Sequence, residues 1–207
     1  MTVQLVVGLQ NPGEKYAGTR HNAGAWLVQA LAQRFGISFK SEKKFFGALG
    51  SVRFEEQEVK FLLPDTYMNE SGRAVAAVSG FFKIAPSQIL VAHDELDLPP
   101  GTARLKAGGG LAGHNGLKDI SRSLGGAKDY LRVRLGIGHP GLASEVIHYV
   151  LKKPSANDQS LIYDAIHEVC GVFADVALGR LERAMLRLRS EEHTSELQSR
   201  PHISYAV

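Results

Sequence analysis

The sequence predicts an α/β protein, a single-domain, three-layer sandwich in which helices flank a mixed, mostly parallel, twisted sheet. Short apolar runs alternate with segments of helical period, the pattern of parallel strands joined by helices. A polar turn over residues 55–57 separates two apolar runs and predicts one hairpin, which makes the sheet mixed. The chain has 207 residues, 44% of them hydrophobic and 22% charged, which is the balance of one globular domain.

The individual elements follow from local patterns. Apolar and β-branched runs predict strands at 3–8, 46–54, 59–63, 89–92, 102–107 and 130–136. The helical period predicts helices at 23–35, 71–82, 117–124 and 156–176. Asn22 and Ser155 are of the types that cap helix N-termini, and Gly36 is typical of a helix C-terminus.

Composition excludes several classes of protein. A single cysteine, Cys170, rules out an internal disulfide framework and a zinc site with paired cysteines, and its helical context predicts a core residue. Residues 1–8 lack the features of a signal peptide, and no uncharged apolar run approaches the roughly 20 residues that span a bilayer. The net charge of +3 is too small to indicate nucleic-acid binding by itself. We therefore expect a cytoplasmic protein without a membrane segment.

Residues 189–207 differ from the rest of the chain. This segment loses the helical period, gains Ser, Glu and His, and resembles the translation of a DNA-sequencing library adapter. One interpretation is a natural tail. The other, which we favour, is that these residues are not native and that the domain comprises residues 1–188.

Polar side chains collect where the predicted apolar strands end, and in α/β sheets ligands bind at that edge. These residues are Asn11, Thr19, Arg20, His21, Asn22, Met68, Asn69, His93, Asp94, His114 and Asn115. The chain has neither the G-x-S-x-G pattern of a nucleophilic serine nor a P-loop. Without a nucleophile, the simplest hydrolytic device is a general base that activates water.

His21 is the candidate base, because it precedes a predicted helix whose positive N-terminal end keeps imidazole neutral. Asp94 would fix the tautomer of the ring, and asparagine amides such as that of Asn11 would bind a developing oxyanion. Two other interpretations stay open: a helix-cap or surface role for His21, and a metal site that it would form with His93, Asp94 and His114. The metal site is disfavoured because no ligand pair has helical spacing. We expect neither a metal nor another cofactor.

Residues 108–113 match the G-x-G-x-x-G pattern of dinucleotide-binding proteins. The preceding strand is half basic and the following helix is short, so a flexible gate is favoured over a dinucleotide site. Basic side chains share faces of two predicted strands and of this short helix, in the pairs Arg104 and Lys106, Arg132 and Arg134, and Lys118 and Arg122. Both a phosphate-binding strip and an ordinary solvated surface are compatible with this pattern.

The chain resembles the bacterial peptidyl-tRNA hydrolase family in segments that occur in the family's order. These segments are 8–13 with Tyr16, 19–22, 64–69, 94–101 and 113–117. Each segment alone is weak, whereas their ordered conjunction is specific, and the resemblance covers residues 5–151 and extends to 188. Gln10 stands where the family usually has glycine, and Tyr67 where it usually has phenylalanine.

The resemblance implies hydrolysis of the ester between a peptide and the terminal ribose of tRNA, which recycles tRNA from stalled or aborted translation. It implies that His21 accepts a proton, that Asp94 holds His21 in its basic form, and that Asn11 contacts the peptide main chain. Further residues would line the tRNA and peptide site, namely Tyr16, Tyr67, Asn69 and Asn115, with Met68 and His114 packing its walls. Lys106 and Arg134 would bind the terminal phosphate, with Arg104 and Lys118 nearby.

Peptidyl-tRNA is then the expected partner, and we expect a monomer with no obligate protein partner. Two rival classes are a metal-dependent amidohydrolase, which chelation would inactivate, and a non-catalytic RNA-binding relative of the same fold. The presence of both His21 and Asp94 speaks against the second.

Overall fold

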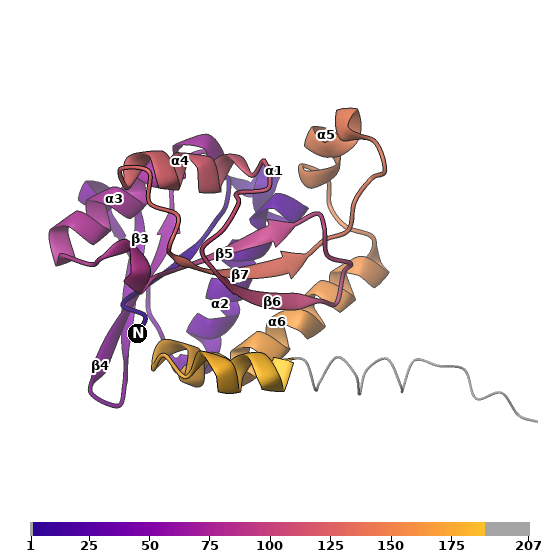
Figure 1. The fold of residues 1–207 in the computed structure, drawn as a ribbon. Helices are drawn as coiled ribbons and strands as arrows, with labels where there is room; N and C mark the ends of the chain where they lie inside the picture. Colours follow the sequence, from indigo (N-terminus) through magenta and orange to yellow (C-terminus); the bar gives the residue numbers. More distant parts are fainter. Residues whose placement is uncertain (1, 189–207) are drawn as a thin grey trace, which may run out of the picture.

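A computed structural model describes residues 2–188 and has three layers, with helices on both faces of a seven-stranded sheet (Figure 1). The strands are β1 (Leu5–Gly8), β2 (Lys40–Glu42), β3 (Gly47–Phe54), β4 (Gln57–Pro64), β5 (Ile89–Glu95), β6 (Ala103–Ala107) and β7 (Leu131–Gly136). The α-helices are α1 (Glu14–Ala17), α2 (Ala23–Phe35), α3 (Ser71–Phe82), α4 (Asn115–Ser123), α5 (Val146–Val150) and α6 (Ala156–Ala177), and residues 181–188 are also helical. Three short 3₁₀ turns matter for the site: η1 (Arg20–Asn22), η3 (Met68–Glu70) and η5 (Ala143–Glu145). The predicted α/β class is confirmed.

The sheet is mixed and has the order β2-β3-β4-β1-β5-β7-β6. Strands β4, β1, β5 and β7 run parallel, and β3 with β4 forms the predicted hairpin. Two further antiparallel pairs, β2 with β3 and β6 with β7, were not predicted. β2 consists of only three residues, all polar, so it has no alternation of hydrophobic and polar residues from which a strand could be predicted.

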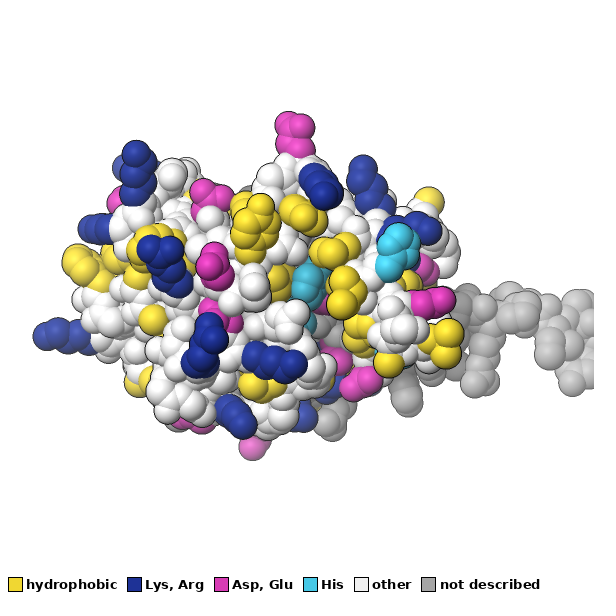
Figure 2. Space-filling model, turned by 90° about the horizontal axis from the view of Figure 1, so that it is seen from above, with side chains coloured by type: hydrophobic (Ala, Val, Ile, Leu, Met, Phe, Trp, Pro, Cys, Tyr) yellow, Lys and Arg dark blue, Asp and Glu magenta, His cyan; other side chains and the backbone are white. Residues whose placement is uncertain are grey.

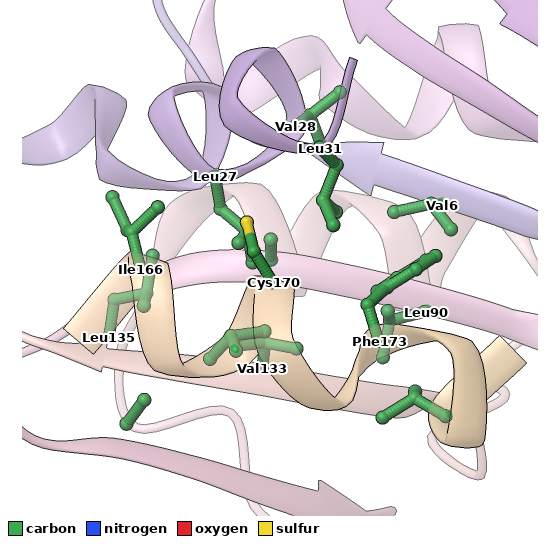
Figure 3. Close-up of a cluster of buried hydrophobic side chains, with 14 of the residues drawn as sticks. Val6, Leu27, Val28, Leu31, Leu90, Val133, Leu135, Ile166, Cys170 and Phe173 are labelled. Carbon is green, nitrogen blue, oxygen red and sulfur yellow. The ribbon is translucent and has the colours of Figure 1, made fainter. Parts of the chain in front are cut away.

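Each face of the sheet supports its own core, because successive strand residues point to opposite faces. In β1, Val6 joins the core under α2 and α6, whereas Leu5 and Val7 join the core under α3 and α4. Figure 3 shows side chains of α2 and α6 meeting those of the central strands, with Cys170 among them. Cys170 is therefore the core residue that its helical context predicts, and burial raises the pKa of its thiol to about 11.

Glycine at position 24 lets the start of α2 lie directly on β5. A Cβ atom there would stand 2.1 Å from the carbonyl oxygen of Ala92, a contact that no side chain tolerates. Because η1 immediately precedes α2, this close approach sets His21 beside the carboxyl end of β5, where Asp94 lies. The site geometry thus depends on a position without a side chain.

The three predicted helix ends are confirmed in position. Gly36 adopts the left-handed conformation with φ of 67°, and the Ser155 hydroxyl accepts a hydrogen bond from the Asp158 amide at 3.1 Å. Asn22 is the N-cap residue of α2, but its side chain makes no cap hydrogen bond. None of the described helices is both long and apolar enough to cross a membrane. The interpretation of residues 189–207 as non-native concerns residues outside the described range.

Candidate active site

A cavity of about 570 Å³ opens where the parallel strands end at their carboxyl termini. It brings together eight of the residues predicted at this edge, namely Asn11, His21, Met68, Asn69, His93, Asp94, His114 and Asn115. The opposite wall comes from η5, α5 and the residue after α5, and its lining residues are all apolar. Figure 2 shows a histidine side chain in a hollow that hydrophobic side chains border.

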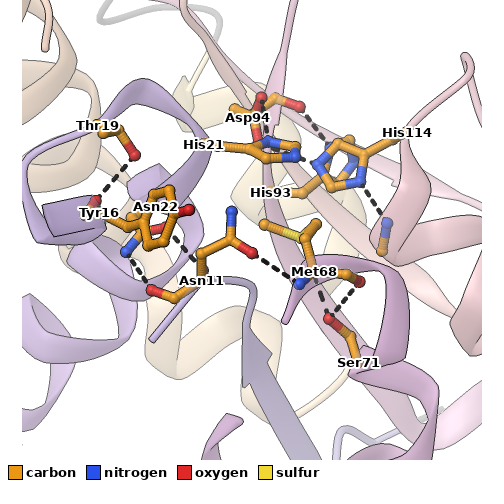
Figure 4. A network of polar contacts seen from close by, with 11 residues as sticks. Asn11, Tyr16, Thr19, His21, Asn22, Met68, Ser71, His93, Asp94 and His114 are labelled. Atoms are coloured by element: carbon orange, nitrogen blue, oxygen red, sulfur yellow. Dashed lines mark hydrogen bonds and ion pairs between the residues drawn. The ribbon is translucent and has the colours of Figure 1, made fainter. Parts of the chain in front are cut away.

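The cavity contains a paired imidazole and carboxylate. His21 Nδ1 lies 2.9 Å from Asp94 Oδ1 and 3.1 Å from Oδ2, and both side chains are buried (Figure 4). An ionised carboxylate only accepts hydrogen bonds, so Nδ1 carries the proton. The lone pair of the neutral ring is therefore on Nε2, the tautomer that a general base needs.

The electrostatics of this pair differ from the sequence prediction. Burial alone would lower the pKa of His21, but the charge and hydrogen bond of Asp94 outweigh it and raise the pKa above its usual value. Burial would raise the pKa of Asp94, whereas the neighbouring His21 and His114 hold it well below its usual range. The expectation that a helix N-terminus keeps His21 neutral is thus wrong about the dominant influence, because His21 lies within η1 in direct contact with a carboxylate.

His114 shares the same carboxylate. Its Nε2 lies 2.9 Å from Asp94 Oδ1, and its Nδ1 accepts a hydrogen bond from the Gly116 amide at 3.2 Å. One neutral tautomer, with the proton on Nε2, satisfies both contacts. The resemblance assigned His114 only to the cavity wall, whereas the structure also makes it a hydrogen-bond donor to Asp94. The helix α4 starts two residues earlier than predicted, which places His114 at its N-cap.

His93 is the third imidazole around this carboxylate. Its Nδ1 lies 2.7 Å from the backbone oxygen of Asp94, and its Nε2 is buried without a hydrogen-bond partner among the described residues. Burial, followed by the neighbouring His114, lowers the pKa of His93 to about 3. His93 is therefore a neutral neighbour of the pair and not a second base.

Asn11 is held by three hydrogen bonds, one to its side-chain oxygen and two to its backbone. Its side-chain oxygen accepts a hydrogen bond from the Met68 amide at 2.8 Å. The Asn22 side chain accepts from the Asn11 amide at 2.8 Å and donates to the Asn11 carbonyl at 3.0 Å. Asn11 Nδ2 thus stays available as a donor, and Figure 4 shows it pointing to the side on which His21 lies. Asn22 is therefore a positioning residue. Its interpretation as a helix cap missed this role, although Asn22 directly follows His21 in the sequence.

The two predicted tyrosines lie beside the cavity and are not among its lining residues. Tyr16 and Tyr67 contact each other edge to face, with ring centroids 6.5 Å apart. Tyr67 is 56% exposed and borders a second, shallower hollow. Its ring is therefore free to contact a substrate from outside the cavity.

The predicted basic residues of β6 and β7 form a strip, since Arg104 lies opposite Arg134 and Lys106 opposite Arg132. Like charges that face each other across two strands repel, so such a strip favours bound anions. Arg134 is not fully available, because its Nε donates to the buried Glu95 carboxylate at 2.8 Å.

Arg132 has a structural role. It is buried and donates to the carbonyl oxygens of Gly108 and, at 2.7 Å, Gly110. It therefore supports the glycine-rich loop that leads to His114. Whether this loop opens and closes stays a prediction.

The site has donor atoms that a metal ion could use. Ligand atoms of His21, Asp94 and His114 lie within 4.8 Å of one another. The hydrogen bonds among these three residues account for their arrangement without an ion. The metal hypothesis therefore remains an alternative that chelation tests.

Comparison with known proteins shows the family of the chain. The sequence model of the family described as peptidyl-tRNA hydrolase matches residues 5–196. The chain belongs to the peptidyl-tRNA hydrolase family. Peptidyl-tRNA hydrolases of Edwardsiella ictaluri and Alcanivorax borkumensis are each 54% identical to it, over 91% and 90% of this chain and 96% and 95% of theirs. A crystal structure of peptidyl-tRNA hydrolase from Acinetobacter baumannii matches with a TM-score of 0.86 and 47% identity, over 90% of this chain and 94% of that one.

The chain matches these family members over nearly their whole length. The described fold is therefore the family's fold. The comparisons do not assign roles to single residues. The roles of the cavity residues are therefore argued from their contacts.

Proposed function

We propose that the chain hydrolyses the ester of peptidyl-tRNA with a water molecule that His21 activates, without a covalent intermediate, and so recycles tRNA in translation. Membership of the peptidyl-tRNA hydrolase family supports the overall reaction. One observation carries the mechanism: the His21–Asp94 pair lies in a cavity whose described lining residues include no serine, threonine, cysteine or lysine.

In the first step, His21 Nε2 takes a proton from water as the oxygen attacks the ester carbonyl. Negative charge develops on the carbonyl oxygen, and Asn11 Nδ2 is the available donor to stabilise it. The positive charge on the imidazolium is stabilised by Asp94, 2.9 Å away.

In the second step, the tetrahedral intermediate collapses and the bond to the ribose oxygen breaks. His21 returns its proton to that oxygen, which leaves as the hydroxyl of free tRNA. An alkoxide departs more readily than the nitrogen anion that an amide bond would have to release, so a base and an oxyanion donor suffice without an acyl-enzyme. His21 ends the cycle neutral.

The tRNA and peptide halves of the substrate are proposed to lie on different sides of the cavity. The basic strip of Arg104, Lys106 and Arg134, with Lys118 on α4, provides charge for phosphates. Asn69, Asn115 and Tyr67 offer amide and aromatic contacts near the scissile bond. Tyr16 supports the Tyr67 ring.

The test uses one N-acetylated and one unblocked aminoacyl-tRNA, each incubated with the protein in the presence and absence of a chelator. We expect cleavage of the blocked form alone, indifferent to the chelator. Loss of activity on chelation would support a metal-dependent hydrolase, and tRNA binding without cleavage would support a non-catalytic RNA-binding protein.

We also propose that the enzyme acts in the cytoplasm as a monomer. A lone buried cysteine suits a reducing compartment, and the cavity is completed by residues of one chain. Size-exclusion chromatography with light scattering at assay concentrations tests the monomer, and a mass of twice the chain would contradict it.

A further inference from the structure

We propose that Arg20 is a positioning residue. It fixes the apolar α5 wall of the cavity against the turn that carries His21, and this wall receives the side chain of the peptide residue next to the ester. The inference rests on the proposed function and adds to it a preference for apolar peptide residues.

Arg20 is buried at 6% exposure, and its side chain contacts the end of α5 and the residues that follow it. Its Nη1 donates to three carbonyl oxygens, those of Tyr149, Lys152 and Lys153, at 3.4, 3.2 and 3.0 Å. The guanidinium also lies over the Tyr149 ring, 4.1 Å from its centroid. These carbonyls lie at and just beyond the C-terminal end of α5, where helices leave acceptors unsatisfied.

The α5 helix depends on such anchoring. It has five residues, and an isolated helix of that length is unstable in water. Val150 is its one buried residue, and Ile147 is 73% exposed. Val146 and Tyr149 pack against the core only in part, so polar contacts with the rest of the fold add to the apolar ones. Besides those of Arg20, the Tyr149 hydroxyl donates to the Ile137 carbonyl at 2.6 Å.

Arg20 connects this wall to the catalytic base through the backbone. Arg20 and His21 are consecutive residues of η1, and the Arg20 amide donates to the Lys152 carbonyl at 3.3 Å. Arg20 Nη2 also lies 3.5 Å from Asp158 Oδ2 in the first turn of α6. The apolar wall and the base therefore belong to one hydrogen-bonded unit, and the distance between them is set by Arg20.

The chemistry of the wall indicates its ligand. The residues that line the cavity from this side are Ala143, Val146, Ile147, Val150 and Leu151. None of these side chains could bind a phosphate, whereas the opposite side supplies the amides of Asn11, Asn69 and Asn115. An apolar side chain of the peptide would bury surface here, and each buried CH₂ is worth about 0.8 kcal/mol.

The first test changes one side chain of the apolar wall and leaves the hydrophobic core unchanged. Ile147→Ser changes an exposed side chain, so the fold is expected to persist. We expect KM for N-acetyl-phenylalanyl-tRNA to rise about 10-fold and KM for N-acetyl-glycyl-tRNA to change less than about 2-fold. An equal change for both substrates would overturn the role of the wall.

The second test addresses Arg20. Arg20→Gln should reproduce the same substrate-selective rise in KM, with kcat on the glycyl substrate and the acid limb of its pH profile unchanged. Arg20→Lys, which keeps a cation for the carbonyls and Asp158, should recover most of the loss. Arg180→Gln is the matched control, since Arg180 pairs at 2.8 Å with Glu55 outside the cavity.

Equal losses on both substrates, or a shifted acid limb, would show that Arg20 acts on the base or on general stability and would overturn the proposal. If Arg20→Gln does not fold, Arg20→Lys alone and combined with Ile147→Ser decides the question, because two changes to one wall should be less than additive. Full additivity would contradict the proposal. Failure of the wild-type chain to cleave either substrate would instead contradict the proposed function.

Discussion

Replacing Asp94 with asparagine keeps the size of the side chain and removes its charge. In the wild type, His21 Nδ1 faces both oxygens, at 2.9 and 3.1 Å, and His114 faces Oδ1 at 2.9 Å. If the asparagine oxygen stays with His114, its NH₂ group stands near 3 Å from His21 Nδ1. His21 Nδ1 then faces this donor beside the oxygen that it shares with His114, so the tautomer with the proton on Nδ1 loses its preference over the one with the proton on Nε2.

The expected loss of rate follows from the tautomer with the proton on Nε2. A ring with Nε2–H cannot accept a proton from water, so the contribution of the general base, about 10²- to 10⁴-fold in rate, is expected to disappear. The residual activity should also have a different pH dependence. Without the charge of Asp94, burial alone acts on the imidazole and lowers its pKa, so the acid limb moves to lower pH. In the wild type the limb should lie above pH 6.5, because the pKa of His21 is raised from 6.5.

The assay is single-turnover cleavage of N-acetyl-aminoacyl-tRNA from pH 5 to 9, with tRNA binding measured in parallel. Asp97→Asn is the matched control, because Asp97 is an exposed aspartate of the same segment. Wild-type activity for Asp94→Asn, or an acid limb that moves to higher pH, would refute the coupling of Asp94 to His21.

The remaining predictions concern the residues that support this pair. Lys106→Ala should lower the slope of log Kd against log salt for tRNA by about 1. Arg134→Ala should weaken binding further, because it also leaves the buried Glu95 carboxylate unpaired. Unchanged slopes in both variants would show that the phosphates bind elsewhere. Asn22→Ala should reduce kcat about 10- to 100-fold, because the backbone of Asn11 loses both hydrogen bonds that hold it in place and the position of its side chain is then less well fixed; a rise in KM alone would contradict that reason. Gly24→Ala should destabilise the fold by about 1–3 kcal/mol in urea unfolding, whereas Gly171→Ala, where a Cβ meets nothing within 4 Å, should be neutral or stabilising.

Most of the fold was predictable from local patterns. The central strands are short apolar runs, and the long helix α6 combines a serine cap with an uninterrupted helical period. The helix over residues 181–188 was not predicted, and β2, α1 and α5 were also missed, which are three to five residues long and have no periodic pattern of their own. Contacts with the rest of the fold stabilise them, and such contacts cannot be predicted from a local sequence pattern.

The site was predictable in its members and less so in its couplings. Eight predicted residues line one cavity, because strand ends in a parallel sheet converge. The sequence could not show that His114 shares the Asp94 carboxylate, that Asn22 holds Asn11, or that Arg134 is paired with Glu95. Each of these depends on distances between segments far apart in the chain.

The role of His21 is the central claim, and His21→Ala tests it most directly. Single-turnover cleavage of N-acetyl-aminoacyl-tRNA at saturating enzyme should fall about 100-fold or more. Affinity for tRNA and the urea unfolding midpoint should stay close to those of the wild type, because the side chain is needed for proton transfer and not for the basic strip. Full cleavage by His21→Ala would contradict the account.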